Sequence, residues 1–126
     1  RCGWFDALQV RHTVRINYMT SLALTKLDVL DGIPEISICV GYEVDGKILD
    51  EMPTALSHLE RAKPVLKHFS GWTESTYGVT DYEKLPKNAK AYLEAISALV
   101  NCRIDIISTS SKRGETIVLR NPFTAE

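Results

Sequence analysis

Apolar residues recur at helical spacing in two stretches of the chain. In residues 6–18 four of them share one helical face, Ala7, Val10, Val14 and Tyr18. Asp6 precedes this stretch and can accept hydrogen bonds from the N–H groups of a first turn. In residues 86–100 the apolar positions follow the same period, and Pro86 suits the first position of a helix. The pattern therefore predicts two main helices.

Other apolar runs have the length and composition of strands. Residues 20–24 form a short apolar run typical of a buried parallel strand, and residues 35–44 alternate and are rich in β-branched side chains. Asp45-Gly46 then predicts a tight hairpin with residues 47–49 as the return strand. Two more strands are predicted at 103–108 and 115–120.

The stretch from 53 to 80 is the least periodic part of the chain. Pro and Gly residues divide it into a short helix at 56–62, a short extended piece at 64–69 and an ordered loop at 71–78. The whole order of elements predicts an α/β fold with an antiparallel hairpin, and the helix at 86–100 suits a right-handed crossover onto a parallel sheet.

The parallel part of this fold is small for a free-standing domain. Only the runs at 20–24 and 103–108 are candidates for it. The chain also begins at Arg1 and runs at once into a dense apolar cluster, whereas natural N-termini are usually polar. We therefore expect the 126 residues to be a segment of something longer.

Composition narrows the function classes. Fifteen Lys+Arg against sixteen Asp+Glu give a net charge of −1, which argues against a general nucleic-acid binder. No apolar run is long enough to predict a membrane span. The three cysteines, spaced neither as zinc ligands nor as a disulfide framework, fit a reducing cytosol.

The most specific chemistry follows the apolar run 20–24. Asp28 would lie at the carboxyl end of a parallel strand, where ligands bind in α/β sheets. One carboxylate can accept hydrogen bonds from both the N1–H and the exocyclic amine of guanine, whereas adenine presents an acceptor at N1. Lys26 can lay its aliphatic stem along the base plane. The alternative is a turn in which Lys26 is solvated and Asp28 is a capping residue. A Lys-x-Asp tripeptide taken by itself has this structural role more often than a guanine-binding role.

A second strand is predicted to end at Ser108, Thr109 and Ser110. A backbone N–H there can donate to guanine O6, although the alternative is a Ser-rich turn with local side-chain-to-backbone bonds. Together with Lys26 and Asp28, the two strand ends converge on one base pocket. The sequence holds no G-x-x-x-x-G-K-[ST] phosphate loop, no His or Cys pair at metal-ligand spacing and no Ser-His-Asp order. It therefore predicts half a nucleotide site, with no catalytic residue and no metal ligand.

Several blocks of the sequence resemble the C-terminal part of the adenylosuccinate synthetases. They span nearly the whole chain in unbroken order: Cys2-Gly3-Trp4-Phe5-Asp6, Leu24-Thr25-Lys26-Leu27-Asp28-Val29-Leu30-Asp31-Gly32, Ile38-Cys39-Val40-Gly41-Tyr42, Gly71-Trp72, Ser75-Thr76, Leu85-Pro86, Ile104-Asp105-Ile106-Ile107-Ser108-Thr109 and Ile117-Val118-Leu119-Arg120-Asn121-Pro122-Phe123. The block at 25–32 is the most specific of them. The resemblance implies that residues 1–126 are the C-terminal segment of a larger, P-loop-like mixed-sheet ligase domain and hold its guanine half-site.

The resemblance also implies an activity. Enzymes of this family are cytoplasmic homodimers that join IMP and L-aspartate to form adenylosuccinate in AMP biosynthesis, with GTP and Mg²⁺. GTP phosphorylates the 6-oxygen of IMP, and the aspartate amine then displaces phosphate. The residues that the resemblance places around the guanine of GTP are Lys26, Leu27 and Asp28 on one side and Ser108, Thr109 and Ser110 on the other.

The family's phosphate loop, catalytic groups, Mg²⁺ ligands and most IMP contacts are expected upstream of this chain, so the 126 residues alone are expected to be inactive. Two alternatives stay open, a non-catalytic guanine-nucleotide-binding module and a structural domain in which Asp28 is a turn residue. The usual Ser-Thr-Gly-Pro of the family stands here as Ser108-Thr109-Ser110-Ser111. A backbone contact at Ser110 therefore requires a conformation that does not need glycine.

Overall fold

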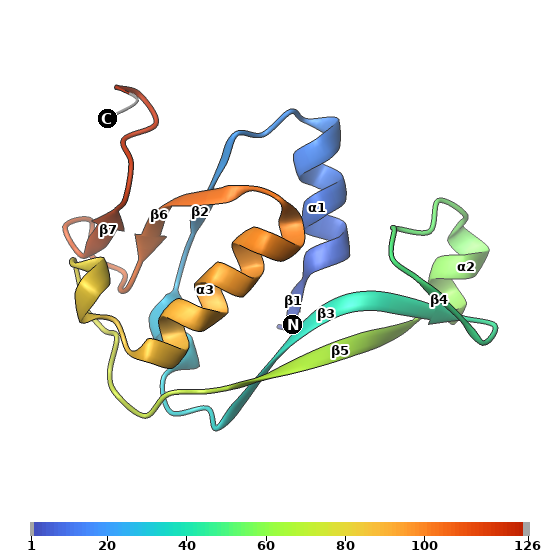
Figure 1. Cartoon of the computed structure of the whole chain (residues 1–126), viewed down its shortest axis with the longest axis horizontal. Coiled ribbons are helices and arrows are strands. Elements are labelled where there is room, and N and C mark those ends of the chain that lie inside the picture. Colours follow the sequence, from blue (N-terminus) through green and yellow to red (C-terminus); the bar gives the residue numbers. More distant parts are fainter. Residues whose placement is uncertain (1, 125–126) are drawn as a thin grey trace.

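The computed structural model describes residues 2–124, which form two small sheets and three α-helices (Figure 1). The elements, in chain order, are β1 (Phe5–Asp6), α1 (Ala7–Ile16), β2 (Ser21–Leu24), the 3₁₀ turn η1 (Leu27–Leu30), β3 (Glu35–Val44), β4 (Lys47–Leu49), α2 (Leu56–Arg61), β5 (Lys63–Ser70), the 3₁₀ turn η2 (Tyr82–Lys84), α3 (Lys87–Val100), β6 (Arg103–Ser108) and β7 (Thr116–Val118). The predicted α/β class, the hairpin and the two main helices are confirmed.

Strand β3 organises the first sheet and β6 the second. β3 pairs with β1 in parallel and with β4 and β5 in antiparallel orientation. β6 pairs with β2 in parallel and with β7 in antiparallel orientation, which confirms the predicted parallel pair. Helix α3 contacts both sheets through β5 and β6, and α1 packs against α3 and β3 (Figure 1). The parallel pairing brings the carboxyl ends of β2 and β6 to one edge.

The hydrophobic core lies between α3 and the two sheets. Its completely buried side chains come from several elements, as Leu27, Ile36, Ile38, Ile96, Val100 and Ile107 show. The apolar face predicted for the second helix is largely buried here. Within residues 2–124 no helix is long and apolar enough to cross a bilayer.

Some boundaries differ from the prediction. The extended piece predicted at 64–69 is the longer strand β5, which pairs with β3 along its whole length. Pro64 is tolerated because it lies next to the first residue of the strand, near the sheet edge. Pro86 is the N-cap of α3 and not its first helical residue. β1 was missed because two residues are too short to show a period.

Asp6 joins the first helix to the first sheet. Its Oδ1 accepts a hydrogen bond from the Gln9 N–H at 3.0 Å, which confirms the predicted N-cap. Its Oδ2 accepts a hydrogen bond from the Tyr42 hydroxyl on β3. Burial, together with Asp6, raises the pKa of Tyr42 above its ordinary value, so the phenol remains a donor. One carboxylate thus fixes where α1 starts relative to the sheet.

Candidate functional site

The ends of β2 and β6 are joined by a direct hydrogen bond. Leu24 lies opposite Ile107 in the parallel ladder, and beyond this pair the backbone N–H of Lys26 donates to Ser108 Oγ at 2.9 Å. The structure therefore brings together residues 82 positions apart, Lys26 and Ser108, which the sequence predicted at one site.

Lys26 turns the chain sharply as it leaves β2. Its backbone is left-handed, with φ 59° and ψ 45°, and the turn η1 starts directly after it. This conformation costs a residue with a side chain about 1–2 kcal/mol, and strain of this kind gathers at functional sites. Lys26 is exposed and lines a hollow of about 220 Å³ together with Leu24, Leu27 and Tyr92.

Asp28 carries an unpaired carboxylate oxygen. The residue is half-buried, and its Oδ1 is fully buried with no hydrogen-bond partner in residues 2–124. Leaving a buried acceptor unsatisfied costs about 1–3 kcal/mol. A donor from outside the described residues, from a ligand or from another part of a longer polypeptide, would remove that cost. Asp105 Oδ2 and Glu115 Oε2 are the other buried carboxylate oxygens without a partner in the described residues.

Asp31, three residues later, has the opposite environment. Its carboxylate accepts hydrogen bonds from Trp72 Nε1 at 2.6 Å, from the N–H and hydroxyl of Thr76 at 2.7 Å each, and from Ser75 Oγ at 3.4 Å. Asp31 therefore anchors the 71–79 loop, a role that sequence reasoning did not assign. The available signal was that Asp31 and Ser75-Thr76 both lie in the blocks that carry the family resemblance.

Leu27 and Thr109 can contribute to a base site only through their backbones. The Leu27 side chain is completely buried in the core. Thr109 is also completely buried, and its hydroxyl donates to the carbonyls of Val79 at 2.8 Å and Glu115 at 3.2 Å. The shorter of these bonds joins Thr109 to a residue 30 positions earlier, so it is a tertiary contact and not the local side-chain-to-backbone bond of the predicted alternative.

Ser110 meets the condition set by the sequence. Outside glycine, positive φ occurs among the described residues only at Tyr18, Lys26, Asp45 and Asn101, so the backbone of Ser110 does not require glycine. Its hydroxyl accepts a hydrogen bond from the Lys112 N–H at 2.9 Å. No hydrogen bond within residues 2–124 uses the Ser110 N–H, which leaves this donor for a ligand.

Glu115 closes the loop that follows β6. The Ser110 hydroxyl and the Lys112 ammonium, 3.3 Å from Oε1, hold the pKa of the Glu115 carboxyl below its usual range. Its carbonyl accepts from the Thr109 N–H at 3.3 Å, and its N–H donates to the Lys112 carbonyl at 3.1 Å. The carboxylate is therefore ionised at neutral pH and keeps residues 109–115 folded on themselves.

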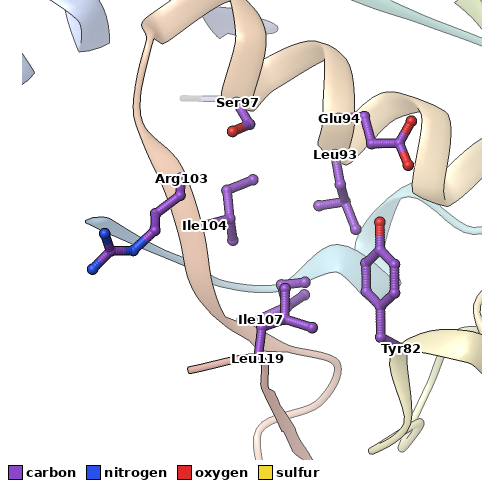
Figure 2. Close-up of a pocket in the computed structure, with 8 residues that line it drawn as sticks. All are labelled: Tyr82, Leu93, Glu94, Ser97, Arg103, Ile104, Ile107 and Leu119. Carbon is purple, nitrogen blue, oxygen red and sulfur yellow. The ribbon is translucent and has the colours of Figure 1, made fainter. Parts of the chain in front are cut away.

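A separate hollow between α3 and β6 is not part of this site. Its volume is about 190 Å³. Figure 2 shows the apolar side chains of Leu93, Ile104, Ile107 and Leu119 among those that line it. Tyr82 and Glu94 lie at one side, and the Arg103 guanidinium points away from it (Figure 2). Binding pockets usually present converging polar groups, and none of the predicted site residues lines this hollow. In the described part of the chain no group of three His, Cys, Asp or Glu residues could hold a metal ion.

Comparisons with known proteins place the chain in one family. The family model for adenylosuccinate synthetase matches residues 1–117. An adenylosuccinate synthetase from Methylobacillus flagellatus is 52% identical over 125 residues, which are 99% of this chain and 28% of that protein. The chloroplastic adenylosuccinate synthetase 1 of Ricinus communis is 49% identical with the same coverage. A solved structure of the fully ligated adenylosuccinate synthetase from Plasmodium falciparum matches with a TM-score of 0.88 and 35% identity, over 94% of this chain and 29% of that one. The chain thus spans about 28% of the length of these curated relatives.

Proposed function

Because the chain belongs to the adenylosuccinate synthetase family, we propose that it supplies the guanine-base recognition of a GTP-dependent ligase that joins IMP and L-aspartate. The observation that carries this proposal is the buried, unpaired Oδ1 of Asp28 beside the joined ends of β2 and β6. Residues 1–126 would form the C-terminal segment of a larger synthetase domain.

In this proposal, residues that follow β2 and residues that follow β6 bind different groups of the guanine base. Asp28 accepts from N1–H and from the 2-amino group, and charge-assisted bonds of this kind are about twice as strong as neutral ones. The Ser110 N–H donates to O6, which lies next to N1 on the same edge of the base. Lys26 covers the base plane with its aliphatic stem. Adenine would set an acceptor against the Asp28 carboxylate and an amine against the Ser110 N–H, so the same groups reject ATP.

The other properties of the whole enzyme belong to the same proposal. IMP, L-aspartate and Mg²⁺ would be bound outside these residues, as the family resemblance implies. A cytoplasmic homodimer, as the family resemblance implies, is the proposed state of the enzyme.

The proposal predicts that the isolated 126 residues are inactive and that the complete enzyme is specific for GTP. We use "complete synthetase" for a polypeptide of the relatives' length that carries these 126 residues. The isolated chain should form no adenylosuccinate from IMP, L-aspartate and GTP with Mg²⁺, whereas the complete synthetase should form it with GTP and not with ATP. A product assay by chromatography measures both. Turnover by the isolated chain, or equal use of ATP and GTP by the complete synthetase, would contradict the proposal.

A further inference from the structure

One loop contacts both halves of the proposed guanine site. Residues 71–79 leave β5 and run towards the part of the molecule where β7 lies (Figure 1). Near its start the loop binds Asp31, three residues beyond Asp28, through Trp72 and Thr76. At its other end it binds Thr109, at the end of β6.

The contacts at the β2 end are short and concentrated on one carboxylate. Asp31 accepts three hydrogen bonds of 2.6–2.7 Å and a fourth at 3.4 Å from this loop. The Gly32 N–H also donates to the Trp72 carbonyl at 3.0 Å. Thr76 is completely buried and Trp72 is nearly so. Hydrogen bonds to a charged acceptor in a buried setting hold their geometry well.

The contacts at the β6 end use the residue beside Ser110. The Gly78 N–H donates to the Thr109 carbonyl at 3.2 Å, and the Thr109 hydroxyl donates to the Val79 carbonyl at 2.8 Å. A Cβ placed on Gly78 would lie 3.4 Å from the Glu115 carboxylate, so the loop also packs against the residue that closes the 109–115 segment. The loop is therefore joined to Thr109 by two hydrogen bonds and packs against Glu115.

We propose that residues 72–79 are a positioning bracket that sets the distance between Asp28 and Ser110. This inference rests on the proposed function, because the two residues must contact neighbouring groups on one edge of the guanine base at the same time, Asp28 the N1–H and the 2-amino group and Ser110 the O6 atom. Binding groups must be held to within about 0.5 Å for such a geometry to be productive. The β2–β6 ladder and the Lys26–Ser108 bond join the two strands up to their ends. The bracket links the segments that follow these ends, in which Asp28 and Ser110 lie. Thr76 within the bracket and Thr109, to which the bracket binds, are the positioning residues, since both side chains are completely buried.

The test compares two nucleotides in the complete synthetase. GTP can use both halves of the site, whereas 6-thio-GTP keeps both donors for Asp28 but carries a sulfur, a poor acceptor, where Ser110 needs oxygen. Thr76→Val and Thr109→Val each remove one hydroxyl that holds the bracket in place, with little change of shape. Each should weaken GTP binding roughly tenfold, the size of one lost buried hydrogen bond, and change 6-thio-GTP binding by less than about twofold.

The controls separate positioning from general stability. Thr76→Ser keeps the hydroxyl and should retain GTP affinity, and Thr54→Val removes the hydroxyl of an exposed threonine and should change neither nucleotide. If Thr76→Val does not fold, Ser75→Ala removes the weakest of the Asp31 contacts and should lower GTP affinity alone, by a smaller factor. Melting temperatures establish which variants are folded.

The possible outcomes distinguish the bracket from the site itself. Equal loss for both nucleotides, or no loss for either, would overturn the bracket. If Asp28→Asn weakens both nucleotides in the same experiment, the guanine site stands even though the bracket has failed. If Asp28→Asn weakens neither, the proposed function itself has failed.

Discussion

Replacing Asp28 with asparagine in the complete synthetase is expected to weaken GTP binding by tenfold or more and to leave the KM for IMP unchanged. Each hydrogen bond to a charged group contributes about 1.5–3 kcal/mol. Asparagine retains one acceptor oxygen but turns an amide donor towards a guanine donor, so one bond is lost and the other is weakened. Steady-state kinetics with varied GTP and varied IMP measure both constants.

Asp50→Asn is the matched control for this change. Asp50 is exposed, and Arg11 donates a hydrogen bond to its backbone carbonyl and not to its side chain. The substitution should therefore alter neither constant. ITP provides a second comparison because it lacks the 2-amino group. Asp28→Asn should therefore cost less with ITP than with GTP. An unchanged apparent affinity of Asp28→Asn for GTP would reject the base-reading role of this carboxylate.

Gly71→Ala is expected to produce the largest loss of stability in the segment. A Cβ on Gly71 would lie 1.7 Å from the carbonyl oxygen of Ile33 and 2.9 Å from its carbonyl carbon, both backbone atoms that cannot rotate away. The Gly71 N–H also donates to the Pro34 carbonyl at 2.9 Å, so the clash disrupts this turn contact as well. Overpacking typically costs about 1–3 kcal/mol, and we expect at least the upper end here.

Thermal unfolding of the complete synthetase measures this loss. Gly114→Ala is the control, because a Cβ there meets no atom within 4 Å. The Gly71 variant should melt several degrees below the Gly114 variant and should also lose GTP affinity, since Trp72 can no longer hold Asp31. Equal melting temperatures for the two variants would show that the close approach at Gly71 is easily relieved.

Local patterns predicted the elements whose structure depends on neighbouring residues. The 3.6-residue period predicted α1 and α3, and Asp45-Gly46 predicted the β3–β4 hairpin, whose turn has positive φ at both residues. The full length of β5 could not be predicted in this way. Its strand character comes from pairing with β3, a tertiary contact, and Pro64 locally opposes it.

The candidate site was predictable only in part, because local sequence patterns do not show which distant residues the fold brings together. Two strand ends with polar residues predicted that Lys26 and Ser108 would meet, and they are hydrogen-bonded. The different roles of Asp28 and Asp31 could not be predicted, because both follow the same strand and are the same residue type. The partners of Asp31 come from residues 41 to 45 positions later in the chain, and only the fold brings them to it.

A structure of the complete synthetase with bound GDP tests the guanine-reading role of this segment most directly. We expect the two carboxylate oxygens of Asp28 to lie about 2.7–2.9 Å from guanine N1 and from the 2-amino nitrogen, with the Ser110 N–H about 2.9 Å from O6. A guanine base bound away from the ends of β2 and β6, with a protein donor from elsewhere in the polypeptide paired to Asp28 Oδ1, would contradict it.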